Sequence, residues 1–174
     1  INTIIQEIEF NQKRFNKKNI STIYFGGGTP SLIKDIYLEK IIKKLNLKFQ
    51  INNKCEITVE ANPDDITVKK LKNWKKMGVN RISLGVQSFD DKVLKKLNRI
   101  HDHKKAIKSI ELIKKHFTNY SVDLMFGTPY SSVKTVTEDL KIISSYIPPH
   151  ISIYNMTLER GTVLYNLIKK NMLT

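Results

Sequence analysis

Residues 20–30 read ISTIYFGGGTP, a short β-branched and aromatic run that stops at three consecutive glycines. The run is typical of a β-strand, and the Thr29-Pro30 pair after the glycines can neither extend a strand nor lie inside a helix. Glycines have no Cβ atom, so a ligand can closely approach their main-chain N–H and C=O groups. We therefore expect a strand that ends in a backbone binding site, with a tight turn that binds nothing as the alternative.

Strand-like and helix-like patterns alternate on both sides of this stretch. Strands are expected at residues 20–25, 55–62, 80–87, 121–126 and 151–155, each followed by an amphipathic helix, and a further amphipathic helix at residues 1–17. This alternation predicts βα units and a parallel sheet, either flat or curled into a barrel. Because the chain opens on a helix at Ile1, without Met, we expect it to be part of a longer protein.

The composition indicates one globular domain over residues 1–174, since 40% of the residues are hydrophobic. No apolar run reaches the roughly 18 residues that a membrane span needs, and no secretory signal opens the chain. Cys55 is the only cysteine, which excludes a disulfide framework and a metal cluster held by this chain's own cysteines. These features predict a cytoplasmic protein.

The chain is strongly basic, with a formal net charge of +14, yet only four of its 30 basic residues are arginine. Most of the lysines fall on the polar faces of the expected helices, whereas arginine is the residue that makes bidentate contacts with phosphates and bases. We therefore expect no nucleic-acid partner. A basic RNA- or DNA-binding module remains as the alternative outside the enzymes.

Three of the expected strands carry polar residues where a buried parallel strand is normally a continuous run of Val, Ile and Leu. The polar or small positions are Thr58, Glu60, Asn62, Ser83, Gly85, Gln87 and Asp123. The apolar face of each strand must pack against the helices, so the polar face points to the inner side of the sheet. Most of these residues lie near the carboxyl ends of their strands, where the active sites of α/β barrels lie. The pattern predicts a polar site at that end.

Each candidate also has a structural alternative. Glu60 or Asp123 alone could be a carboxylate paired with a lysine, and Arg99 could be a surface residue unless an anion lies nearby. His101 and His103 have no third ligand at metal-like spacing, so we expect them only to begin a helix. Three tyrosines could serve either the site or packing: Tyr24, Tyr130 and Tyr154. A redox-free α/β barrel that binds a phosphorylated metabolite at the glycine turn also remains open.

Five motifs follow one another in order along nearly the whole chain. They are FGGGTPS at 25–31, VEANP at 59–63, GVNRISLGVQSF at 78–89, Arg99-x-His101, and DLMFGTP at 123–129. Together they resemble the radical S-adenosylmethionine proteins related to oxygen-independent coproporphyrinogen III oxidase. The QSFDD sequence at 87–91 and the Arg-x-His loop are more similar to the heme chaperone branch of that family than to the oxidase.

The resemblance implies the fold and the cofactors. It implies a partial (β/α)6 barrel whose first strand is missing, with residues 1–174 as its central part. S-adenosylmethionine would bind at the top of the barrel to one iron of a 4Fe-4S cluster, and its reductive cleavage would give a 5′-deoxyadenosyl radical. The cofactor-binding positions that the resemblance implies are Gly27, Gly28, Thr29, Glu60, Gln87, Arg99 and Asp123.

The same resemblance implies what the chain lacks and what the whole protein does. The Cys-x-x-x-Cys-x-x-Cys loop that holds the cluster would precede residue 1, a C-terminal domain would follow, and Cys55 cannot replace three thiolates. We expect the chain alone to be inactive and, with an uncovered strand at 20–25, to self-associate. The task implied for the whole protein is to bind heme and pass it to hemoproteins, with oxidative decarboxylation of coproporphyrinogen III as the alternative.

Overall fold

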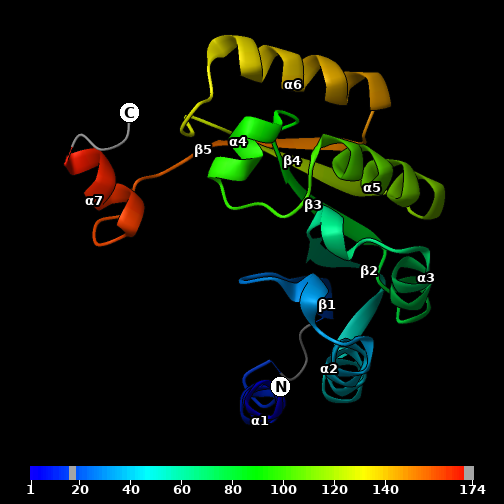
Figure 1. The fold of residues 1–174 in the computed structure, drawn as a ribbon. Helices are drawn as coiled ribbons and strands as arrows, with labels where there is room; N and C mark the ends of the chain where they lie inside the picture. Colours follow the sequence, from blue (N-terminus) through cyan, green and yellow to red (C-terminus); the bar gives the residue numbers. More distant parts are fainter. Residues whose placement is uncertain (16–18, 171–174) are drawn as a thin grey trace.

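The structure is a computed structural model that describes residues 1–15 and 19–170. Its strands form one five-stranded sheet in the order β1-β2-β3-β4-β5, and every neighbouring pair is parallel (Figure 1). The strands are β1 (Asn19–Phe25), β2 (Gln50–Ala61), β3 (Arg81–Gln87), β4 (Tyr120–Phe126) and β5 (His150–Asn155). Because sequential strands are also spatial neighbours, their carboxyl ends all meet at one end of the sheet.

A helix precedes β1, and helices follow each strand. They are α1 (Asn2–Asn11), α2 (Asp35–Lys48), α3 (Val68–Lys76), α4 (Asp91–Lys96), α5 (His103–His116), α6 (Val133–Tyr146) and α7 (Val163–Lys169), with short 3-10 helices η1 (Pro30–Leu32) and η2 (Pro63–Asp65). Figure 1 shows α2, α3, α5 and α6 along the outer face of the curved sheet, while α7 lies apart from it. The inner face is left without a helical layer in the described residues, which gives a half-barrel and confirms the predicted fold class.

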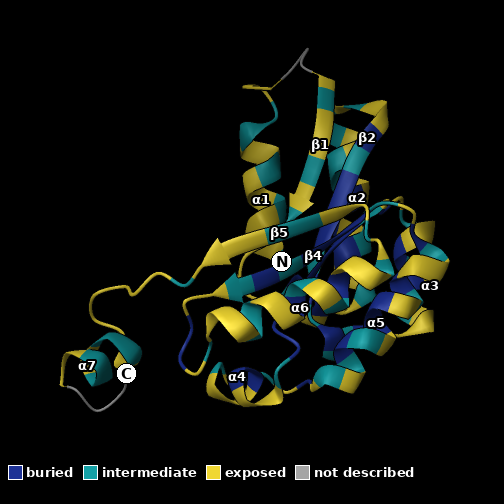
Figure 2. Cartoon of the chain, turned by 90° about the horizontal axis from the view of Figure 1, so that it is seen from above, coloured by how far each residue is buried: buried dark blue, intermediate teal, exposed yellow. Residues whose placement is uncertain are grey.

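The hydrophobic core lies between the sheet and the outer helices. Leu84 of β3, Ile110 of α5 and Trp74 of α3 are each at most 1% exposed. Figure 2 shows the buried residues concentrated on the central strands and on the helix faces that meet them, and α1 and α7 contribute none. In the part of the chain that the structure describes, no helix is long and apolar enough to cross a membrane.

Two predicted boundaries were wrong. The expected strand at 55–62 begins earlier, at Gln50, and three extra residues of β2 lie between its pairings Ile20↔Ile51 and Thr22↔Glu56. The polar residues in that insertion hid the strand's beginning. The expected helix at 1–17 ends at Asn11 and continues as a turn; residues 16 and 17 lie outside the described residues.

The β1 strand lies at one edge of the sheet, as expected, and β5 lies at the other. Each edge strand therefore has backbone N–H and C=O groups that are not paired within the described sheet. That β1 makes the isolated chain self-associate stays a prediction.

Candidate functional site

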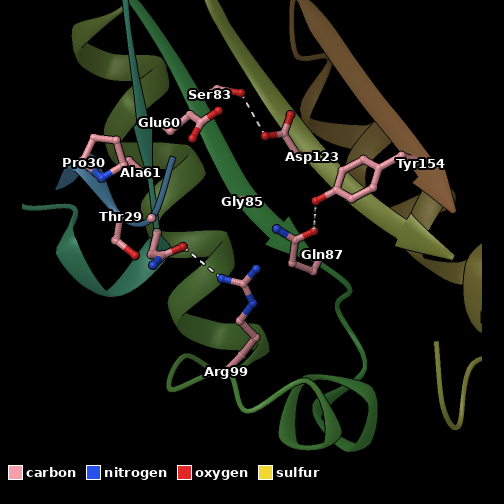
Figure 3. A pocket seen from close by; sticks show the side chains of 12 residues that line it. Thr29, Pro30, Glu60, Ala61, Ser83, Gly85, Gln87, Arg99, Asp123 and Tyr154 are labelled. Atoms are coloured by element: carbon pink, nitrogen blue, oxygen red, sulfur yellow. Dashed lines mark hydrogen bonds between the residues drawn. The ribbon is translucent and has the colours of Figure 1, made fainter. Parts of the chain in front are cut away.

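Polar side chains from successive strands meet at the carboxyl ends of the sheet, on its inner face (Figure 3). They surround a cavity of about 190 Å³. Its lining residues are Gly28, Thr29, Pro30, Glu60, Ala61, Asn62, Ser83, Gly85, Gln87, Arg99, Asp123 and Tyr154. The carboxyl ends of parallel strands are the usual place for binding sites in α/β folds, because loops and helix beginnings converge there.

Most of the predicted site residues line this cavity. They are Gly28, Thr29, Glu60, Gln87, Arg99 and Asp123. The seventh, Gly27, does not line it but donates its backbone N–H to Oε2 of Glu60 at 3.1 Å. The structure therefore brings together residues that are far apart in the sequence, from the loop after β1 to the middle of β4. That these residues bind a cofactor stays a prediction.

The glycine loop after β1 is shaped by its lack of side chains. A Cβ atom on Gly26 would lie 2.9 Å from Cε1 of Tyr24 and 3.0 Å from Oε1 of Glu60, so the ends of these two side chains would have to move to make room for it. Gly27 and Gly28 have φ values of +80° and +60°, in the left-handed region that favours glycine. A Cβ atom on either would meet nothing within 4 Å, so the backbone of this loop is open to a ligand.

Two carboxylates lie on one side of the cavity, Glu60 from β2 and Asp123 from β4, with β3 between them (Figure 3). The Asp123 carboxylate accepts hydrogen bonds from the hydroxyls of Ser83, at 2.8 Å, and Ser121, at 3.0 Å. Burial raises the pKa of Asp123, and the negative charge of Glu60 raises it further, while the two serine hydroxyls act in the opposite direction. This side of the cavity therefore suits groups that donate hydrogen bonds or carry positive charge.

Arg99 lies on the opposite side of the cavity from these carboxylates (Figure 3). Its Nη1 donates to Oδ1 of Asn62 at 3.0 Å, which fixes the guanidinium against the end of β2. The remaining N–H groups of a guanidinium suit a carboxylate, which they can bind bidentately. With a cation on one side and two carboxylates on the other, the cavity is complementary to a zwitterion.

Gln87 reaches the cavity through an irregular backbone. The pairing of β3 with β4 shifts between Gly85↔Asp123 and Gln87↔Leu124, so that β3 has one extra residue, and Gln87 has a φ of +72°. Such a conformation costs a non-glycine residue on the order of 1–3 kcal/mol. Bulges next to binding sites commonly re-aim a side chain, and here the bulge presents the Gln87 amide to the cavity.

Tyr154 is the lining residue whose role the sequence left open between packing and the site. Its hydroxyl donates to Oε1 of Gln87 at 2.7 Å, and burial raises the pKa of Tyr154, so the hydroxyl keeps its proton. This hydrogen bond fixes the orientation of the Gln87 amide and uses one acceptor position of its oxygen, and the NH₂ group is the donor that Gln87 can offer to a ligand. The alternation of Ser152 and Tyr154 on one face of β5 was the signal that could have identified this residue.

His103 begins α5, as predicted, whereas His101 lies before the helix and its N-cap residue Asp102. Both histidines hold the neighbouring loop. Nε2 of His101 lies 3.1 Å from the carbonyl oxygen of Val86, and Nδ1 of His103 lies 3.1 Å from that of Phe89. In residues 1–15 and 19–170, no group of three or more His, Cys, Asp or Glu side chains is placed to hold a metal ion.

A family model for the radical SAM superfamily matches residues 3–143 of this sequence. The chain belongs to the radical SAM superfamily. This assignment confirms the family that the motifs indicated and disfavours a redox-free barrel. Among the described residues only the three-residue η1 directly follows the glycines, so no full helix begins there to bind a phosphate.

Several of the curated relatives that this chain matches are named heme chaperones. The chain is 39% identical to the heme chaperone HemW of Buchnera aphidicola subsp. Schizaphis graminum, over 95% of this chain and 44% of that protein. It is 37% identical to HemW of Bacillus subtilis, over 99% of this chain and 46% of that protein. The chain thus spans less than half the length of these relatives.

Solved structures share the fold, one of them described as a radical SAM enzyme. The coproporphyrinogen III oxidase HemN of Escherichia coli superposes with a TM-score of 0.83 at 28% identity, covering 90% of this chain and 36% of that one. Elp3 of Methanocaldococcus infernus superposes with a TM-score of 0.75 at 24% identity, covering 98% of this chain and 45% of that one. The half-barrel of this chain is therefore also present in these two proteins.

Radical SAM chemistry uses S-adenosylmethionine and a 4Fe-4S cluster, and the described residues fit the first of these and not the second. The cavity's opposed charges and open glycine backbone fit S-adenosylmethionine, which carries an amino acid carboxylate, an ammonium, a sulfonium and ribose hydroxyls. They do not fit a 4Fe-4S cluster, which needs several thiolates. Cys55 is the only cysteine, it is buried in β2, and burial raises its thiol pKa.

Proposed function

We propose that this chain is the central, S-adenosylmethionine-binding part of a longer heme-handling protein, most like the heme chaperones. The observation that carries the proposal is the cavity at the strand ends, with Arg99 on one side and Glu60 and Asp123 on the other. A charged amino acid attached to a nucleoside is a ligand that matches this distribution of charge.

Each residue of the cavity has a role in the proposal. Arg99 would bind the carboxylate of S-adenosylmethionine. Glu60, Gln87 and Asp123 would bind its ammonium and ribose hydroxyls. The glycine loop would contact S-adenosylmethionine through main-chain groups. Gly28 and Thr29 would do so from the cavity wall, and Gly27 would also keep its hydrogen bond to the Glu60 carboxylate.

The cluster belongs to another segment in this proposal. S-adenosylmethionine supplies a carbon-centred radical when it is bound to a reduced 4Fe-4S cluster, and the thiolates for that cluster are not among the described residues. Tyr154 and Asn62 do not act on the reaction themselves; they orient Gln87 and Arg99. We expect this chain alone to be inactive.

The heme-handling part of the proposal rests on the relatives named heme chaperone. In this reading the intact protein binds heme and delivers it to acceptor hemoproteins, and it acts in the cytoplasm. Coproporphyrinogen III oxidation is the second candidate, because HemN superposes with a TM-score of 0.83.

The test uses the intact protein, purified and reconstituted without oxygen. Calorimetry with S-adenosylmethionine tests the cavity, and absorption spectroscopy with heme tests the chaperone reading. Incubation with coproporphyrinogen III, S-adenosylmethionine and a reductant tests the oxidase. Heme binding without turnover is expected, turnover would select the oxidase, and no S-adenosylmethionine binding would overturn the proposal. Salt-sensitive binding to RNA or DNA would instead favour a nucleic-acid module.

A further inference from the structure

A buried carboxylate of α6 holds the loop that follows Gln87. Asp139 is only 5% exposed, and its Oδ2 accepts a hydrogen bond from the Ser88 hydroxyl at 2.7 Å. Its Oδ1 accepts the backbone N–H of Phe89 at 2.8 Å. Burying a carboxylate is costly unless its hydrogen bonds are satisfied, and here both oxygens are used on two adjacent loop residues.

Other side chains secure the same loop. The Ser88 hydroxyl oxygen also accepts the backbone N–H of Asp90 at 3.1 Å, and Asp90 in turn caps α4. His101 lies beside the carbonyl oxygen of Val86, and His103 lies beside that of Phe89. Residues 86–90 are therefore attached to two other parts of the fold, the α6 helix and the beginning of α5.

The conformation of Gln87 requires such support. Its φ of +72° is unfavourable for a residue with a Cβ atom, and such conformations persist only where the surrounding structure determines them. Asp139 fixes the next two residues, so the chain leaving Gln87 has little freedom to relax. Asp139 itself is not among the residues that line the cavity.

We propose that Asp139 is a positioning residue: by holding Ser88 and Phe89, it keeps Gln87 in the left-handed conformation that presents the amide to the cavity. The inference rests on the proposed function, since it assumes that the cavity binds S-adenosylmethionine. It assigns to α6, on the outer face of the sheet, a part in shaping a site on the inner face.

The test measures the dissociation constant for S-adenosylmethionine in the intact, reconstituted protein. Asp139→Ala removes both acceptors and is expected to raise this constant about tenfold. Asp139→Asn keeps an acceptor for the Phe89 N–H and is expected to have a smaller effect. Glu138→Ala is the matched control, because Glu138 is the adjacent carboxylate of α6, is exposed and pairs only with Lys141 among the described residues.

A double-mutant cycle separates positioning from general stability. In a Gln87→Ala background, Asp139→Asn and Asp139→Ala should no longer change the dissociation constant, while each still lowers the melting temperature. An equal loss of affinity with and without the Gln87→Ala substitution would overturn the inference, as would unchanged affinity of Asp139→Ala in the protein that retains Gln87. If the wild-type protein fails to bind S-adenosylmethionine, the proposed function fails first.

Discussion

Replacing Arg99 with alanine tests the charge arrangement of the cavity most directly. The substitution removes the guanidinium that faces the two carboxylates across the cavity, together with its 3.0 Å hydrogen bond to Asn62. The backbone hydrogen bond from the Arg99 N–H to the Leu94 carbonyl oxygen remains, so the loop should keep its path. We expect weaker binding of S-adenosylmethionine and an intact fold.

The magnitude follows from the kind of contact that is lost. A hydrogen bond to a charged group contributes about 1.5–3 kcal/mol. At about 1.4 kcal/mol for each factor of ten, the dissociation constant should rise about 10- to 150-fold. Arg99→Lys keeps the charge but not the planar fork, so its loss should be smaller.

Isothermal titration calorimetry on the intact, reconstituted protein measures this change. Arg14→Ala is the matched control, because Arg14 is exposed, precedes β1 and lies outside the cavity lining. Melting temperatures of all three variants check that the fold is retained. Unchanged affinity in Arg99→Ala, or an equal loss in Arg14→Ala, would refute the assigned role.

Three further predictions concern stability and assembly. Burial raises the pKa of Asp123, so the folded state holds this proton more tightly than the unfolded state does. The stability of the wild-type protein should therefore fall as the pH rises from the ordinary aspartate pKa of about 3.9 through the raised pKa of the folded state. Asn does not titrate, so the melting temperature of Asp123→Asn relative to wild type should increase over that pH range, and a decrease would contradict this. Gly26→Ala should displace only the ends of the Tyr24 and Glu60 side chains, because Gly26 is exposed and its Cβ would meet these flexible groups and no backbone atom. The free energy of unfolding in a urea titration should therefore change by no more than about 0.5 kcal/mol, and a larger loss would argue against the packing described. The isolated chain should self-associate through β1, and a monodisperse monomer by light scattering would count against this.

Much of the fold could be predicted from local patterns. The alternation of strands with amphipathic helices indicated five parallel strands, and polar residues at every second position of β2 and β3 indicated which face held the site. These features depend on neighbours within one element, so a single sequence reveals them. The early beginning of β2 was missed because its first residues are stabilised by pairing with β1 and not by their own pattern.

The finer arrangement of the site depends on contacts between distant residues. The alternation of polar and apolar residues predicted that Gln87 lies on the inner face. It did not predict the bulge and the positive φ through which Gln87 reaches the cavity. The hydrogen bond from Tyr154 to Gln87 joins residues 67 positions apart, and that from Ser88 to Asp139 joins residues 51 positions apart. No local pattern encodes such partners.

The free edges of the sheet determine where another segment could join it. β1 and β5 are the edge strands, and the cavity lies between them at their carboxyl ends. A strand added alongside β1 in the parallel sense would deliver its own carboxyl end next to the triple glycine, whereas one added alongside β5 would arrive beside Tyr154. Groups brought in from elsewhere could thus complete the chemistry at the rim while the existing strands keep their register.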